Sequence, residues 1–220
     1  MKRIIIFLAV IMVIPAVAFC STSKLLERDT ELHPQGWIAG ALTFKEGTTV
    51  ILNDNNEVIS GDLRWNERLL TVGYSSALFE EIPGGARALV AFKPGRVTFN
   101  ERGLVLSGTL QHDATVILYG DANPVVYLKY GTYIEFNNDG SLLRGTPKAD
   151  TYFHPKGWRT SLPNNINAGF VKFKGLTEVL FGSNGEVITG TLANDLTIGV
   201  TTYPAGTTLR FSETANPQRI

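Results

Sequence analysis

The chain has 220 residues, and its 20 lysines and arginines balance its 20 aspartates and glutamates, so the formal net charge is zero. This balance argues against a nucleic-acid-binding protein and against an acidic disordered chain. The apolar content of 44% is also too high for intrinsic disorder. We therefore expect a folded chain of one domain or two small ones, with no nucleic-acid partner.

Residues 1–18 have the pattern of an export signal. Lys2 and Arg3 precede an apolar run at residues 4–14, and an Ala-Val-Ala triplet follows at residues 16–18. A basic start, a short apolar segment and an A-x-A end are typical of a secretory signal peptide. The alternative is a membrane anchor, but the apolar run is shorter than the about 20 residues that cross a bilayer. We expect cleavage after the triplet and no membrane span in the remaining chain.

Cys20 is the only cysteine, so the chain can form neither an internal disulfide nor a cysteine-based metal site. Its place directly behind the signal suggests a second destination, a bacterial lipoprotein acylated on Cys20. The residue before a lipidated cysteine is normally small, and Phe19 does not fit that pattern. We therefore favour free export to the periplasm or the outside of the cell, with the Cys20-linked lipoprotein as the alternative.

Four copies of one pattern, F-K-x-G-T-x-V-x-F-N-x-x-G-x-V-x-x-G-T-L-x-x-D, run through the chain. The copies open at Phe44, Phe92, Leu128 and Phe173, and they close at Asn66, Asp113, Asp150 and Asp195. The opening and closing residues are 22, 21, 22 and 22 positions apart, whereas the connectors vary between 15 and 26 residues. Units of fixed length with variable connectors are typical of repeat proteins.

The repeat begins and ends on half copies. Residues 29–37 match residues 150–158, the back end of a unit, and residues 203–211 match a front end. One hypothesis is that the two halves pair, complete a fifth unit and close the structure; the alternative is that both halves cap an open array. We divide the mature chain into a flexible N-terminal segment, a β-repeat domain and a flexible tail, at residues 19–28, 29–211 and 212–220.

Each unit predicts a β-hairpin. Valine, phenylalanine, threonine and isoleucine alternate with polar residues, for example at 48–52 and 132–136, as in half-buried strands. The residues that follow are rich in asparagine and glycine, which tolerate the positive φ of tight turns. Because one hairpin alone is marginal in water, the units must pack on each other. We expect a mostly antiparallel all-β hairpin-repeat array, with residues 75–82 as its one helix candidate.

Familiar catalytic motifs are absent from the sequence. It contains no H-E-x-x-H and no G-x-S-x-G motif, and no phosphate-binding glycine loop follows a strand. We therefore expect a protein that is not an enzyme, with no catalytic residue, no cofactor and no metal site. The oxygen-rich residues 53–57 could form a calcium loop, but the repeat places them at a hairpin turn, which we favour.

One acidic residue recurs at the same place in the repeat, as Asp29, Asp113, Asp150 and Asp195. A row of carboxylates could bind a cation or a sugar, and a glycosidase would need two of them within ~5–10 Å of each other. Alternatively, an aspartate at a turn accepts hydrogen bonds from backbone N–H groups. Recurrence from unit to unit favours this structural role.

A duplicated His-Pro-x-Gly-Trp motif is the most distinctive feature of the sequence, with His33 and Trp37 in one copy and His154 and Trp158 in the other. Exposed tryptophan faces could stack on sugar rings while histidine adds a hydrogen bond. Alternatively, the motif forms a tight turn whose tryptophan packs at the edge of the hydrophobic layer. We favour packing, because tryptophan buries a large area.

These patterns predict an exported, non-enzymatic β-repeat protein with a structural or partner-binding role at the cell envelope or outside the cell. The alternative is a carbohydrate-binding module that uses the tryptophan and histidine platforms. We expect a protein or glycan partner at the envelope, and an open array would also permit self-association through its strand edges.

Overall fold

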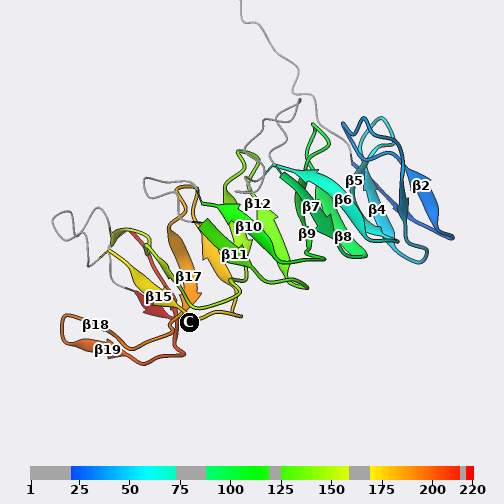
Figure 1. The fold of residues 1–220 in the computed structure, drawn as a ribbon. Helices are drawn as coiled ribbons and strands as arrows, with labels where there is room; N and C mark the ends of the chain where they lie inside the picture. The colour runs from blue at the N-terminus through cyan, green and yellow to red at the C-terminus, as the bar shows by residue number, and fades with distance from the viewer. Residues whose placement is uncertain (1–20, 73–87, 119–124, 159–168, 214–216) are drawn as a thin grey trace, which may run out of the picture.

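The computed structural model describes residues 21–72, 88–118, 125–158, 169–213 and 217–220 (Figure 1). The elements named in these ranges are all β-strands, and nearly all of them pair in antiparallel register. The expected all-β antiparallel class is therefore confirmed. The expected signal peptide, Cys20 and the helix candidate at 75–82 lie outside the described residues.

One sheet, which we call the long sheet, runs from one end of the molecule to the other. Its strands follow each other in antiparallel order. In that order they are β1 (Thr22–Leu25), β4 (Thr49–Leu52), β5 (Val58–Leu63), β8 (Gly95–Phe99), β9 (Val105–Thr109), β12 (Tyr133–Phe136), β13 (Leu142–Gly145), β16 (Val179–Phe181), β17 (Val187–Thr191), β20 (Thr208–Arg210) and β21 (Gln218–Arg219).

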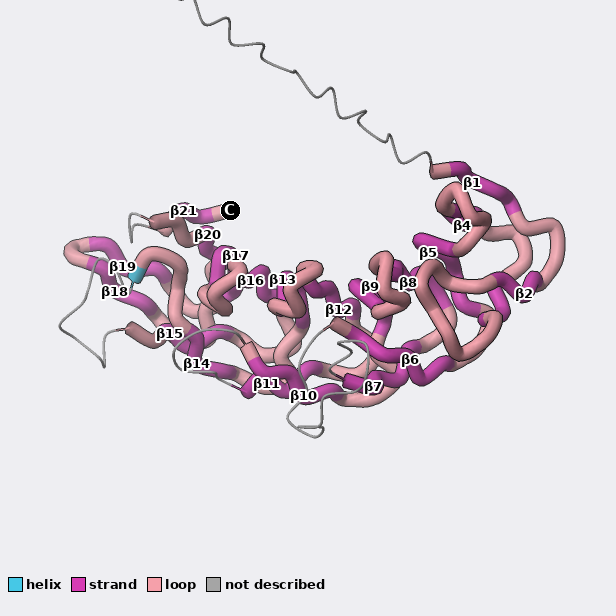
Figure 2. The backbone as a smooth tube through the Cα atoms, turned by 90° about the horizontal axis from the view of Figure 1, so that it is seen from above, coloured by secondary structure: helices cyan, strands magenta, loops and turns pink. Residues whose placement is uncertain are grey.

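A second layer, which we call the hairpin layer, consists of antiparallel strand pairs in the segments that connect the units. The pairs are β2 (Thr30–Leu32) with β3 (Leu42–Phe44), β6 (Glu67–Thr71) with β7 (Ala88–Phe92), β10 (Ala114–Ile117) with β11 (Val125–Leu128), β14 (Thr151–Phe153) with β15 (Val171–Phe173), and β18 (Leu196–Ile198) with β19 (Thr201–Tyr203). Figure 2 shows a crescent with the long sheet on its concave side and the hairpin layer on its convex side.

The tight turns of the long sheet share one conformation. The first residue donates its N–H to the carbonyl of the residue four positions on, as from Asn53 to Glu57 at 2.9 Å. Asn53 Oδ1 also accepts the N–H groups of Asn55 and Glu57, so the turn interpretation of residues 53–57 is confirmed. The fourth residue of each turn has positive φ, and these residues are Asn56, Gly103, Gly140 and Gly185.

A large side chain rests on a glycine between the two layers in each unit. Phe92, at the end of β7, is fully buried, and a Cβ on Gly108 would lie 2.6 Å from its Cδ1. Glycine lets the ring approach the sheet backbone closely. The same contact pairs Phe44 with Gly61, Phe173 with Gly190, and Leu128 with Gly145. The recurring phenylalanine and glycine of the repeat therefore join the layers.

The first and last strands lie at opposite ends of the long sheet (Figure 2), because β1 opens its strand order and β21 closes it. The closure hypothesis is therefore wrong, and the described strands form an open array. The terminal segments that we expected to be flexible also differ. Residues 22–25 form β1 against β4, and residues 218–219 form β21 against β20. Periodicity missed both strands because they are too short to show alternation.

Candidate functional site

The recurring aspartates hold the turn that opens the following unit. Each carboxylate accepts the backbone N–H of the residue two positions after the one that opens the next unit. The donors are Glu46 to Asp29, Tyr130 to Asp113, Gly175 to Asp150 and Ala205 to Asp195, at 2.8–2.9 Å. The prediction that these residues cap turns is confirmed.

Three of these carboxylates also face a cation, two of them closely, whereas Lys172 Nζ lies 3.9 Å from Asp150 Oδ2. Arg64 Nε lies 2.7 Å from Asp29 Oδ2, and Lys148 Nζ lies 2.6 Å from Asp113 Oδ2. The pKa of Asp29 lies below its ordinary value, chiefly because its carboxylate accepts the Glu46 N–H and then because of Arg64. Lys148 is the main cause of the lowered pKa of Asp113. Both carboxylates are therefore occupied by groups of the protein itself.

The unit that closes on asparagine supports the same role. Asn66 stands in the aspartate position, and the residue in the donor position is Pro94. Proline has no N–H to donate. The unit that lacks the N–H donor thus also lacks the carboxylate. A cation or sugar site would not require this match.

Both copies of the His-Pro-x-Gly-Trp motif form the same turn across the long sheet. Gln35 donates its N–H to Val58 O at 3.0 Å, and Val58 donates to His33 O at 2.8 Å. The equivalent bonds of the second copy join Lys156, Val187 and His154, at 2.9 and 2.8 Å. Gly36 has a φ of 64°, and a Cβ there would collide with the carbonyl of Glu101 in the next turn. The motif therefore ties the hairpin layer to a neighbouring unit of the long sheet.

The two tryptophans of the motif differ in accessibility. Trp158 is only 6% exposed and meets Phe211 edge-on, with ring centroids 6.2 Å apart. Trp37 is partly buried and packs against the core. His154 stacks on Phe170 at a centroid distance of 3.8 Å. The enclosed ring of Trp158 weighs against a sugar-stacking face in the second copy, and ligand binding by the motif residues stays a prediction.

The convex side of the hairpin layer exposes large apolar side chains on neighbouring hairpins. Tyr127 on β11 is 63% exposed and Tyr152 on β14 is 56% exposed, and Leu89 on β7 and Val125 on β11 are 37% and 39% exposed. On β11 and β14 they alternate with buried residues, so these side chains point away from the long sheet. Sequence reasoning missed this set. Its signal is a tyrosine at the repeat position where Thr43 stands in the first unit.

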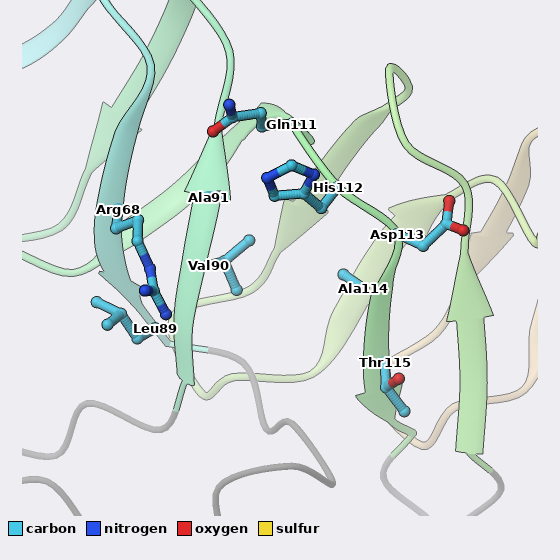
Figure 3. A pocket seen from close by; sticks show the side chains of 9 residues that line it. All are labelled: Arg68, Leu89, Val90, Ala91, Gln111, His112, Asp113, Ala114 and Thr115. Atoms are coloured by element: carbon cyan, nitrogen blue, oxygen red, sulfur yellow. The ribbon is translucent and has the colours of Figure 1, made fainter.

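A groove opens between β7 and β10, and we call it the β7–β10 groove (Figure 3). At one end of the groove, β7 and the segment before β10 are joined by a hydrogen bond, because Gln111 donates its N–H to Ala91 O at 2.8 Å. Beyond this bond no strand pair joins β7 to β10 in the described part of the chain. The groove has a volume of about 340 Å³, and its lining includes Arg68, Val90, His112 and Ala114.

Comparison with protein-family models, with curated proteins and with solved structures finds no match to this chain. Within the described ranges, no three His, Cys, Asp or Glu side chains gather where they could hold a metal ion. No helix in these ranges has the length and apolarity to cross a membrane. Function must therefore be inferred from the geometry of the two layers.

Proposed function

We propose that this chain is an exported, non-enzymatic repeat protein whose hairpin layer binds a partner macromolecule at the cell envelope or outside the cell. The observation that carries the proposal is the set of apolar and aromatic side chains exposed on β7, β11 and β14. Large apolar patches on soluble proteins commonly mark interaction sites. Tyrosine is enriched at interfaces because its ring offers contact area while its hydroxyl remains hydrogen-bonded.

The architecture suits such a role. Repeat arrays present extended faces, and each hairpin contributes a few outward side chains to the convex side. Ring-on-glycine contacts such as Phe92 on Gly108 fix the hairpins to the long sheet. A surface held in place before binding loses little entropy when a partner docks.

Capture of a partner from envelope extracts of the producing cell tests the proposal. We expect the unaltered chain to retain a partner that the double variant Tyr127→Ser, Tyr152→Ser loses. Ile51→Ser is the matched control, because Ile51 is 37% exposed on the opposite layer. Equal capture by all three proteins would contradict a binding role for the hairpin layer.

The export part of the proposal has its own measurement. We expect the chain recovered from the soluble fraction of its producing cell to have the mass of residues 19–220. A membrane-bound form that starts at Cys20 and carries added acyl mass would instead support the lipoprotein alternative. An uncleaved chain in the cytoplasm would contradict export.

Glycan binding is the alternative, and accessible rings favour it. Trp65 is 55% exposed, with the Arg64 guanidinium 4.4 Å from the centre of its ring. In the first motif copy, His33 is exposed and Trp37 is partly buried. Affinity electrophoresis in polysaccharide gels tests this alternative, with Trp65→Ala and Trp37→Ala as variants. It requires that a gel retards the unaltered chain and that one of these changes relieves the retardation.

A further inference from the structure

We propose that the β7–β10 groove binds an extended acidic peptide segment of a partner protein as an added β-strand. The inference rests on the proposed function, because it names the chemistry of the partner and the part of the hairpin layer that recognises it. Strand addition to an exposed sheet edge is a general mode of peptide recognition, in which backbone hydrogen bonds give affinity and side-chain pockets give specificity.

The first support is a strand edge with no strand partner among the described residues. One side of β7 pairs with β6, whereas within the described ranges its other side meets the β10 segment only near the bond from Gln111 N–H to Ala91 O. Backbone groups of alternate residues in a strand point to the same side. Leu89 therefore faces the groove as Ala91 does, and the Gln111 N–H faces it from the other wall. These backbone groups offer a template for an added strand.

The second support is the room left by two small residues. Ala91 and Ala114 line the groove, and both positions carry larger side chains in the other units. The residues equivalent to Ala91 are Thr43, Tyr127, Lys172 and Thr202, and those equivalent to Ala114 are Thr30, Glu67, Thr151 and Leu196. This is the one place in the repeat with alanine in both walls. The space is therefore a feature of this unit and not of the repeat.

The floor of the groove is apolar. Val90 and Ala114 lie in the space between the two strands (Figure 3), and both pack against the hydrophobic core. Side chains of a strand alternate between the two faces of a sheet. Every second side chain of an added strand would therefore turn toward this floor, which favours small apolar residues at those positions.

The rim of the groove carries one cationic side chain and one histidine. Arg68 and His112 line it on the exposed side. The remaining charged lining residue is Asp113, whose carboxylate is already engaged by Lys148 Nζ at 2.6 Å and by the Tyr130 N–H at 2.8 Å. The outward side chains of an added strand thus meet the guanidinium of Arg68, which has no ion-pair partner among the described residues and favours a carboxylate there.

A nuclear magnetic resonance titration of the whole ¹⁵N-labelled chain tests the inference. The probe is an end-blocked octapeptide that alternates glutamate and valine, and the matched probe carries lysine in place of glutamate. At millimolar peptide, where even weak binding is detectable, we expect the acidic probe to shift the amides of Leu89, Ala91 and Asp113. The lysine probe should bind at least about tenfold more weakly.

Two variants define the site. Ala91→Tyr fills the groove with the residue that stands at the equivalent position 127, and it should abolish the shifts. Thr43→Tyr introduces the same side chain at the same repeat position of another unit and should leave the amide shifts intact. Arg68→Glu needs no space in the groove and should reverse the preference between the two probes, so the inference remains testable if Ala91→Tyr does not fold.

Two results would overturn the inference: no shift of the groove amides with the acidic probe, or undiminished shifts in a folded Ala91→Tyr chain. If the groove amides do not shift but partner capture still depends on Tyr127 and Tyr152, only the assignment of the groove is wrong. Loss of that tyrosine dependence would remove the proposed function itself.

Discussion

Leu176 occupies a backbone conformation that other units give to glycine. In the turn after the opening phenylalanine and lysine, Gly47 and Gly131 have φ values of 71° and 75°, and Leu176 has 59°. The glycine of this unit stands one position earlier, at Gly175, where a Cβ would lie 2.5 Å from the backbone carbon of Ala149. Close packing against Ala149 thus requires glycine at position 175, and the position with positive φ is occupied by Leu176.

Leu176→Gly is therefore expected to stabilise the fold. A non-glycine residue in the left-handed region destabilises the fold by roughly 1–2 kcal/mol. Glycine removes this cost, but it loses more conformational entropy on folding, which offsets roughly 0.5–1 kcal/mol of the gain. Little burial is lost, because Leu176 is 66% exposed. Urea unfolding should show a gain of up to about 1.5 kcal/mol. Gly47→Ala, the reverse change at the same repeat position, should lower stability.

Asp113→Asn tests turn capping through pH. Because the pKa of Asp113 is lower in the folded chain than its ordinary value, its ionised form adds stability above the unfolded pKa of about 3.9, and this is lost as pH falls through the folded pKa. The variant should unfold at lower urea than the unaltered chain at pH 7, and the gap should shrink below pH 4. Asn66→Asp is the control, because Pro94 offers no N–H, and it should bring no comparable gain. A gap independent of pH would contradict the assignment.

Residue roles were predictable where they repeat. Four aspartates at one position of the pattern indicated a cap, and the bonds from Glu46 to Asp29 and its equivalents bear this out. The candidate groove was not predictable, because it depends on departures from the pattern, the alanines at 91 and 114. The same holds for Tyr127, whose exposure follows from a pairing that the sequence does not display.

At the scale of elements, the hairpins of the long sheet were predictable because strand, turn and strand are neighbours in sequence. The turn at residues 53–57, between β4 and β5, shows this plainly. The hairpin layer was harder, because the strands of one pair can lie far apart, as β14 and β15 do on either side of residues 154–170. Such pairing depends on packing over the long sheet and not on local turn chemistry.

Gly108→Ala tests the contact between the layers. The added Cβ would lie 2.6 Å from Cδ1 of the fully buried Phe92 ring, and overpacking of this kind costs about 1–3 kcal/mol. Gly145→Ala is the matched change, where the neighbour is Leu128 and the nearest approach is 2.9 Å. A leucine side chain moves more easily than a ring in a packed core, so this variant should lose less stability. Equal losses in thermal unfolding would contradict the ring-on-glycine account.

The turn of the His-Pro-x-Gly-Trp motif makes a second prediction at this scale. Gly36→Ala combines left-handed strain with a collision against the Glu101 carbonyl, so it should cost more than about 2 kcal/mol. Gly47→Ala has similar φ but open space around the new Cβ and should cost only about 1–2 kcal/mol. If calorimetry found the two variants equally stable, the motif would not join the layers as described.

At the scale of the whole molecule, the described strands form an open crescent whose long sheet ends at β1 and β21. Both edge strands are short and carry a basic residue, Lys24 in β1 and Arg219 in β21. Short, charged edges resist pairing with another chain. Self-association through these edges stays a prediction, and repulsion between the basic residues of the two edges opposes it.

Photocrosslinking in the producing cell tests this account most directly. A benzophenone side chain is placed at Leu89 on the hairpin layer, or at Ile51 on the long sheet; both residues are 37% exposed. We expect a covalent adduct of defined mass from position 89 and none of comparable yield from position 51. Adducts of equal yield from both layers, or from position 51 alone, would contradict the assignment of partner binding to the hairpin layer.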